Sequence, residues 1–261
     1  MPPARALLYA ATLAVLVLAA RAVVVVPPPL PVAAFACLAY LAFILAGVLF
    51  LRLEMFADVI TTGPREARGF VLTFDDGPDP ASTPRVLDAL DSAGAKATFF
   101  VIARKAEAHP ELVNEIVVRG HAIGLHSYAH DRLFSMRSSR YVHSDLARGL
   151  AVLESITGKR PALFRPPIGH TNPIIARVSE ELGLSIVGWS VSALDGTSGA
   201  SVDRVVARVS SRLHDGAIVL MHDASERGTH APVAPDAIAR IVAAAREARM
   251  DVVPLASWVG E

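Results

Sequence analysis

From Gly69 to the C-terminus the sequence repeats one pattern, in which a short apolar run precedes a segment with the apolar spacing of an amphipathic helix. Short apolar runs bounded by turn residues are typical of buried strands. Strands that alternate with helices form parallel sheets, because each helix carries the chain back to the start of the next strand. The pattern therefore predicts an α/β fold with a parallel sheet, either closed into a barrel or open.

The individual elements follow from the same spacing. We assign strands to residues 70–74, 97–102, 122–125, 162–164, 184–187, 217–221 and 252–255. Helical spacing occupies residues 112–118, 146–156, 174–182, 202–213 and 237–248. Proline is favoured in the first turn of a helix, and it marks four predicted helix starts. These prolines are Pro84, Pro110, Pro173 and Pro235.

The N-terminal region has a different composition. Residues 6–26 are apolar except for Arg21, and residues 30–51 form a second, uncharged run. Each run is long enough to cross a hydrocarbon core of about 30 Å as a helix. The three prolines at residues 27–29 cannot continue the first helix, so the two runs are predicted to form a helical hairpin. The alternative for the first run is a signal peptide cleaved near residues 20–22.

We therefore expect a membrane hairpin at residues 1–52, a linker at 53–68 and a folded domain at 69–261. Arg5, Arg52, Arg65 and Arg68 flank the hairpin, whose loop carries no charge. Because Lys and Arg are enriched in cytoplasmic segments next to membrane helices, this distribution predicts an integral protein of the cytoplasmic (inner) membrane with its domain in the cytoplasm. If only the second run crosses the membrane, the domain lies outside, and the sequence leaves both topologies open.

The overall charge argues against a nucleic-acid-binding protein. The chain has 25 Lys and Arg residues and 25 Asp and Glu residues, so its formal net charge is zero. A protein that binds nucleic acid needs a basic surplus to neutralise phosphates, and we expect no such partner. Cys37 is the single cysteine, so no disulfide framework exists within the chain.

Several residues that are typical of catalytic or binding sites lie at the C-terminal ends of the predicted strands. They are Asp75 and Asp76, then His126, Arg165, Trp189 and His222. In a β/α barrel the active site is built from the C-terminal ends of the strands. The sequence therefore predicts one site at that rim.

Asp76, His126 and His130 form a candidate metal site. Two adjacent carboxylates are costly unless a metal binds one of them, which leaves the other to act as a base. The two histidines converge on one ion if the turn between them is helical, and three protein ligands leave an open position, as in catalytic sites. The alternatives are a solvated Asp-Asp-Gly-Pro turn and two hydrogen-bonded loop histidines.

Arg165 and His222 complete the candidate site. Arg165 precedes a stiff loop with two prolines, and a fixed guanidinium can orient a carboxylate bidentately and keep it ionised. His222 directly follows an apolar strand, where a general acid would face the rim. His170 lies near the rim without an assigned role. The histidines that lack a comparable partner are predicted to be exposed or structural: His109, His121, His143, His214 and His230.

These residues resemble the ordered motifs of the polysaccharide deacetylase family, the NodB-homology esterases of carbohydrate esterase family 4. The matching segments within residues 69–255 are 73–78, 126–130, 165–169, 192–196 and 220–222. The resemblance implies a distorted (β/α) barrel with about seven parallel strands. It also implies a metal-dependent hydrolase that removes an N-acyl group, foremost N-acetyl, from an amino-sugar polysaccharide or glycan.

The resemblance further implies a role for each residue. Asp75 is expected to be the catalytic base, steadied by Arg165, while Asp76, His126 and His130 bind one divalent ion. Zn²⁺ is the first expectation, and Co²⁺, Ni²⁺ or Mn²⁺ also suit nitrogen and oxygen ligands.

His222 is expected to be the acid, tuned by Asp195. The expected oxyanion and substrate contacts are Pro167, Ile168 and Trp189. The sequence departs from the family at Gly196, where a tryptophan usually lines the sugar groove, and at Ile168, where an aromatic residue is usual. These departures concern the substrate more than the chemistry.

Two alternative functions follow. The hairpin and its arginines favour a deacylase of a lipid-linked sugar at the cytoplasmic membrane face, in contact with membrane lipid. The altered fourth motif favours an inactive carbohydrate-binding homologue.

Overall fold

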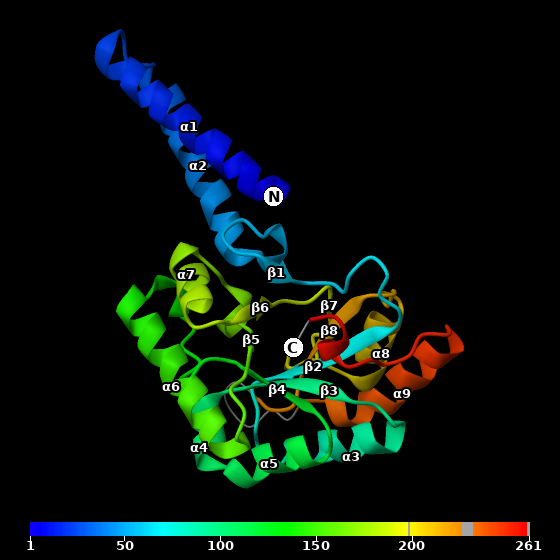
Figure 1. Ribbon diagram of the computed structural model, residues 1–261. Coiled ribbons are helices and arrows are strands. Elements are labelled where there is room, and N and C mark those ends of the chain that lie inside the picture. The colour runs from blue at the N-terminus through cyan, green and yellow to red at the C-terminus, as the bar shows by residue number, and fades with distance from the viewer. Residues whose placement is uncertain (198, 226–231, 260–261) are drawn as a thin grey trace.

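The computed structural model describes residues 1–197, 199–225 and 232–259. A sheet of eight parallel strands lies at its centre, in the order β1-β6-β5-β4-β3-β2-β8-β7. The strands are β1 (Val59–Ile60), β2 (Phe70–Asp75), β3 (Ala97–Val101), β4 (Ala122–Leu125), β5 (Leu163–Phe164), β6 (Ser185–Val187), β7 (Val191–Ser192) and β8 (Ala217–His222). The sheet curves into a barrel that remains open between β1 and β7, which confirms the predicted distorted (β/α) barrel (Figure 1).

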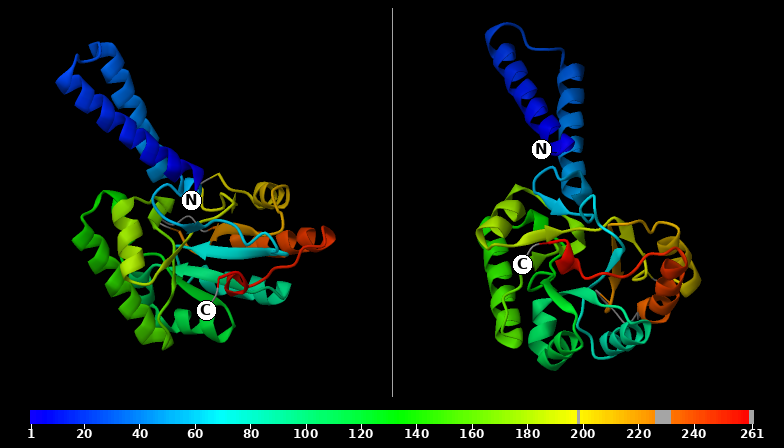
Figure 2. Two further views of the ribbon diagram at one scale, coloured as in Figure 1. Left: turned by 45° about the horizontal axis from the view of Figure 1, so that its top comes forward. Right: turned by 45° about the vertical axis from the view of Figure 1, so that its right-hand side comes forward.

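The helices of the domain lie around the outside of this sheet (Figures 1 and 2). They are α3 (Thr83–Ala93), α4 (Ala103–Ala108), α5 (Pro110–Val118), α6 (Ser139–Thr157), α7 (Pro173–Glu181), α8 (Val202–Ser210) and α9 (Ala234–Glu247). All four predicted proline starts are confirmed, since α3, α5, α7 and α9 each carry proline in their first two positions. The fixed φ of proline suits these positions, and its missing N–H has no partner there in any helix.

The side chains of β2 alternate between two buried environments. Phe70, Leu72 and Phe74 pack with the helices in the large core cluster, while Val71 belongs to a second cluster inside the barrel. Burying a side chain of this size stabilises the fold by about 1.5–3 kcal/mol. Because side chains alternate along a strand, Asp75 shares the interior face with Val71, and the strand delivers its carboxylate into the barrel.

Three strand assignments differ from the sequence prediction. Val191 and Ser192 form β7 and pair with β8, although no strand was expected there. Val59 and Ile60, in the segment assigned as a linker, form β1 and pair with β6. The expected strand at residues 252–255 is wrong, because Val252 forms only an isolated bridge with Phe70 and Leu255 begins a 3-10 helix, η4 (Leu255–Ser257). An apolar run can be buried beside a sheet edge without pairing along its length, and local sequence does not distinguish the two cases.

The N-terminal helices α1 (Pro3–Val24) and α2 (Leu30–Leu49) form the predicted hairpin, which projects away from the domain (Figure 2). Both are long and apolar enough to cross a membrane, and a signal sequence near the N-terminus meets the same criteria. The hydroxyls of Thr12 and Tyr40 lie 2.7 Å apart and join the two helices. Arg5 contacts the Asp58 carboxylate at 2.8 Å and so ties the start of α1 to the segment before β1.

Candidate active site

Asp75 and Asp76 diverge at the C-terminal end of β2. Asp75 is the last residue of the strand and pairs in register with His222 of β8. Asp76 has a left-handed φ of 76°, so the chain turns and the two carboxylates leave in different directions. The next residue must be glycine, because a Cβ on Gly77 would lie 2.0 Å from the Asp223 carboxylate.

Arg165 lies in the barrel interior with its side chain fully buried. Its Nη1 donates to Asp75 Oδ1 at 2.7 Å and to Thr73 Oγ1 at 2.8 Å. The other nitrogens donate to the backbone carbonyls of Val187 and Gly188. The arginine is therefore fixed on every side, although its contact with Asp75 is through one carboxylate oxygen rather than the bidentate pair expected from the sequence.

The candidate metal ligands come together from two rim loops. One ligand atom from each of Asp76, His126 and His130 lies within 4.8 Å of the others, and all three residues are buried. Asp76 Oδ1 is 3.6 Å from His126 Nε2 and 3.4 Å from His130 Nε2. Ligand atoms about 2.0–2.1 Å from a tetrahedral ion lie about 3.4 Å apart, so this donor set fits a zinc-like ion.

The protonation of His126 also suits a metal ligand. Its Nδ1 lies 2.7 Å from the Arg165 carbonyl oxygen, and this contact assigns the proton to Nδ1 and leaves the Nε2 lone pair facing Asp76. Complete burial lowers the pKa of His126 to about 3, against a smaller opposing effect of that hydrogen bond. The imidazole is therefore neutral at physiological pH, as metal binding requires.

The loop between the two histidines is not the helical turn expected from the sequence. Ser127 and His130 have φ values of 62° and 50°, and Ser127 Oγ accepts a hydrogen bond from the His130 N–H at 2.9 Å. Asp145 of α6 accepts hydrogen bonds from the N–H groups of Tyr128 and Ala129, at 2.8 and 3.1 Å. The left-handed backbone at Ser127 and His130, together with the hydrogen bonds accepted by Ser127 and Asp145, brings the two imidazoles together instead.

Asp145 is a positioning residue that the sequence analysis missed. It is buried on α6 together with Val142, Leu146 and Gly149, and burial raises the pKa of its carboxyl group. An aspartate on the apolar face of an amphipathic helix is the signal that would have found it, because a buried carboxylate requires hydrogen-bond donors nearby.

His222, which is half-buried, and Asp195, which is fully buried, form a second pair on the rim. Both oxygens of Asp195 contact the histidine: Oδ1 lies 2.9 Å from Nδ1, and Oδ2 accepts from the His222 backbone N–H at 2.8 Å. Burial alone would lower the pKa of His222. The hydrogen bond and charge of Asp195, together with the charges of Asp75 and Asp76, outweigh burial and raise the pKa to about 9.

Unusual backbone conformations concentrate around these residues. Among the described residues, seven that are not glycine have positive φ, and five of them lie at the candidate site: Asp76, Ser127, His130, Ile168 and Leu194. Such conformations cost on the order of 1–3 kcal/mol each and persist where the surrounding structure fixes them. Their concentration at one rim indicates a functional site.

The predicted substrate contacts lie on the same side. Pro167 and Ile168 belong to the 3-10 helix η3 (Pro167–Gly169), and Ile168 has a φ of 51°, which is unusual for a β-branched residue. The Trp189 ring packs so closely on Gly169 that a Cβ there would lie 2.4 Å from it. The assignment of these three residues to the oxyanion and the substrate stays a prediction.

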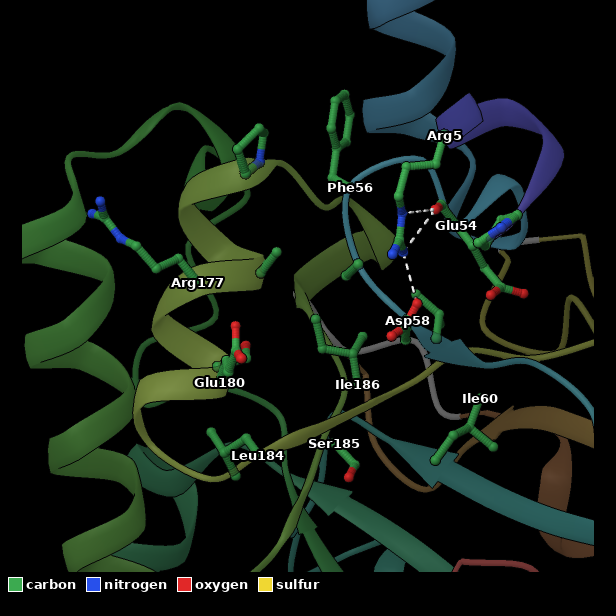
Figure 3. A pocket seen from close by; sticks show the side chains of 16 residues that line it. Arg5, Glu54, Phe56, Asp58, Ile60, Arg177, Glu180, Leu184, Ser185 and Ile186 are labelled. Carbon is green, nitrogen blue, oxygen red and sulfur yellow. Dashed lines mark hydrogen bonds and ion pairs between the residues drawn. The ribbon is translucent and has the colours of Figure 1, made fainter. Parts of the chain in front are cut away.

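A small cavity of about 200 Å³, the catalytic pocket, opens beside the acid pair, and its lining includes Asp76, Ser192, Gly196 and His222. A Cβ on Gly196 would lie 3.3 Å from His222 Nδ1, so the absence of a side chain there leaves the imidazole accessible. A separate cavity of about 740 Å³ lies at the hairpin base around Arg5 and Asp58 and contains none of the predicted site residues (Figure 3). His230 lies outside the described residues.

Carboxylate, guanidinium and imidazole side chains that gather at the C-terminal rim of a β/α barrel are typical of metal-dependent hydrolases. The family model described as polysaccharide deacetylase matches residues 62–187. A peptidoglycan-N-acetylglucosamine deacetylase from Bacillus cereus is 34% identical over 181 residues, which is 69% of this chain and 64% of that protein. The crystal structure of a peptidoglycan N-acetylglucosamine deacetylase superposes with a TM-score of 0.70 at 32% identity and covers 76% of this chain and 91% of that chain. The chain belongs to the polysaccharide deacetylase family, as the motifs predicted.

The chain also resembles two further members of the family, which it covers to different extents. The peptidoglycan-N-acetylglucosamine deacetylase PgdA from Listeria monocytogenes is 40% identical over 152 residues, which is 58% of this chain but 32% of that protein. The chain thus spans about one third to two thirds of the length of these two curated relatives. A mutant of a CE4 family pseudoenzyme with restored enzymatic activity also superposes, with a TM-score of 0.70 at 26% identity over 79% of this chain and 73% of that chain.

Proposed function

We propose that this protein is a metal-dependent hydrolase that removes the N-acyl group, foremost N-acetyl, of an amino-sugar unit in a glycan. The observation that carries the proposal is the convergence of three groups on one rim: the Arg165–Asp75 pair, the Asp76, His126 and His130 ligand set, and the Asp195–His222 pair. Membership of the deacetylase family and relatives named for peptidoglycan deacetylation support it.

Asp76, His126 and His130 would hold the ion. A divalent ion bound there would supply Lewis acidity, which polarises the acyl oxygen and lowers the pKa of water. Zn²⁺ is the first candidate for two imidazoles and one carboxylate, and Co²⁺, Ni²⁺ and Mn²⁺ are further candidates.

Asp75 is positioned to act as the base. Arg165 engages its Oδ1, while its Oδ2 lies on the side of His126, 3.9 Å from Nε2, where attacking water would be located. Asp75 accepts the proton of that water as the oxygen attacks the acyl carbon. Removing one partner of a buried ion pair costs about 3–5 kcal/mol. Because moving the Asp75 carboxylate away from Arg165 would break such a pair, the carboxylate is held in this orientation.

His222 is positioned to act as the acid. Its Nδ1 is engaged by Asp195, which leaves Nε2 to donate a proton to the sugar nitrogen as the carbon–nitrogen bond breaks. The products are a carboxylic acid, which then loses its proton to solvent, and an amine, and the proton taken by Asp75 balances the one given by His222. A raised pKa keeps the donor protonated at neutral pH.

The Asp195→Asn variant should change the pH dependence of turnover. A general acid works only while protonated, so activity falls as pH rises through the pKa of His222. Without the Asp195 charge, burial is less strongly opposed and the pKa of His222 falls, so the alkaline limb should move to lower pH by about 1–3 pH units. Profiles of kcat measured from pH 6 to 10 test this, and an unmoved alkaline limb would contradict the assigned role.

A direct assay tests the proposed function. The full-length protein in detergent, loaded with Zn²⁺ or Co²⁺, is incubated with peptidoglycan fragments and tri-N-acetylchitotriose, and acetate release is measured. We expect release that stops after chelation and returns with added metal. If the protein binds metal but releases acetate from neither substrate nor from a lipid-linked amino sugar, the inactive carbohydrate-binding reading is preferred, which the glycine at position 196 also favours.

We also propose that α1 and α2 anchor the protein in the cytoplasmic membrane. The full-length chain should remain in the membrane fraction after high-salt and carbonate washes, because two apolar helices of 22 and 20 residues would have to leave the bilayer together. Intact-mass measurement provides the control, since loss of about the first 20 residues would indicate a cleaved signal peptide. A reporter fused to the C-terminus would then report the side of the membrane.

A further inference from the structure

A third cavity lies between the foot of the hairpin and the loop that carries Ile168. It has a volume of about 480 Å³, within the range of about 300–1,000 Å³ for ligand pockets, and we call it the hairpin-foot cavity. Its lining includes Leu49 and Phe50 at the C-terminal end of α2, and Ile168 and Trp189. The Thr171 N–H donates to the Val48 carbonyl at 3.1 Å, so the loop that carries Ile168 is bound directly to α2.

The hairpin-foot cavity adjoins the catalytic pocket, because Ser192 lines both. Arg208 Nε donates to the Ser192 carbonyl at 2.8 Å and fixes the segment between them. A ligand that fills the hairpin-foot cavity therefore lies next to the pocket that contains Asp76 and His222.

The lining is strongly cationic. Arg52, Arg208 and Arg212 contribute three guanidinium groups, four hydroxyl side chains also line the cavity, and the described lining includes no carboxylate. None of the three arginines forms an ion pair with another described residue. Uncompensated guanidinium groups beside hydroxyls are the donor set that binds phosphate esters.

The location of these arginines favours a phosphate that is attached to a lipid. Leu45, Leu49 and Phe50 are 55%, 41% and 52% exposed, so the cavity opens beside the apolar surface that the hairpin would present to lipid. If a phosphate in the cavity carries a lipid, the hydrocarbon chain of that lipid can lie along α2. A soluble phosphate would make no contact with this apolar surface.

We propose that the hairpin-foot cavity binds the phosphate or diphosphate of a lipid-linked, N-acetylated amino sugar. This inference rests on the proposed function and names the substrate class of the same site. The 1-phosphate and the 2-acetamido group of such a sugar are attached to neighbouring ring carbons. A phosphate held by Arg52, Arg208 and Arg212 therefore directs the acetamido group into the adjoining catalytic pocket.

The test compares two substrates of the metal-loaded, full-length protein in detergent micelles. One is farnesyl diphospho-N-acetylglucosamine, and the other is tri-N-acetylchitotriose, which has no phosphate. The Arg52→Gln/Arg212→Gln variant should lower the ratio of kcat/KM for the first over the second by about 30-fold or more, mainly through KM, because one charge-assisted hydrogen bond contributes roughly tenfold to hundredfold. The Arg52→Lys/Arg212→Lys variant should recover part of that ratio.

The matched control is Arg140→Gln/Arg204→Gln, which removes the same charge from exposed positions on α6 and α8 outside the cavity and should leave the ratio unchanged. Thermal unfolding of all variants checks that they fold. An unaltered ratio in folded Arg52→Gln/Arg212→Gln protein would overturn the proposal.

Binding without turnover separates this inference from the proposed function. In an Asp75→Asn background, the affinity for farnesyl diphospho-N-acetylglucosamine should fall at least tenfold when Arg52 and Arg212 are replaced. Affinity for phosphatidylglycerol vesicles should fall less. An equal loss for the vesicles would assign the cavity to membrane phospholipid and overturn the proposal. Arginine-dependent binding of the sugar diphosphate without deacetylation by the wild type would support the cavity and reject the proposed function.

Discussion

Full-length protein with His126→Ala and His130→Ala is expected to contain almost no bound divalent metal and to lose its acetate-releasing activity. Asp76 alone would remain of the ligand set, and a single exchangeable carboxylate does not retain a transition metal at micromolar concentration. Lewis-acid stabilisation is worth several kcal/mol, and each 1.4 kcal/mol or so is a factor of ten in rate, so turnover should fall by about 10³-fold or more.

Elemental analysis of the purified variant tests the loss of metal, and acetate release tests the loss of turnover. The double variant His143→Ala/His214→Ala is a matched control, because both of these histidines are exposed and neither belongs to the ligand set. Wild-type metal content in the His126 and His130 variant would show that the site assignment is incorrect.

The Asp75→Asn variant is expected to keep its metal and lose most of its turnover. Asparagine preserves the shape of the side chain and one oxygen that can accept from Arg165, but it is not a base. General base catalysis contributes about 10²–10⁴-fold, so kcat should fall within that range. Because Arg165 is fully buried and loses its counter-charge, the variant should also unfold at a lower temperature.

The Asp76→Asn variant provides the comparison for Asp75→Asn. It changes the neighbouring carboxylate, whose Oδ1 lies nearest the two imidazoles, and should lower the metal content. Measurement of metal and kcat for both variants distinguishes a base from a ligand. If Asp75→Asn and Asp76→Asn lose metal to the same extent, the division of roles between the two carboxylates is wrong.

Local pattern in the sequence was sufficient for the fold class. Strands buried on both faces need continuous apolar runs, and proline in the first turn marks helix starts, so the parallel α/β sheet and most of its elements were predicted. The pattern left open whether the sheet closes, and the distorted barrel was expected from the family resemblance. The rim was predictable for a related reason. The C-terminal ends of parallel strands meet on one side, so Asp75, His126, Arg165 and His222 were expected to converge although they are distant in sequence.

Only the tertiary structure determined how the rim residues are held. The loop from His126 to His130 depends on left-handed residues and on Asp145, whose contacts come from a helix that begins nine residues after His130. The two-residue strand β1 has too few residues to show a period, and its pairing with β6 depends on a partner more than 120 positions away. Arg52 likewise lines the hairpin-foot cavity together with Arg208 and Arg212, which are distant from it in sequence. Apolar periodicity reports which face of a segment is buried, but not which distant segment covers it, and that choice is made by packing.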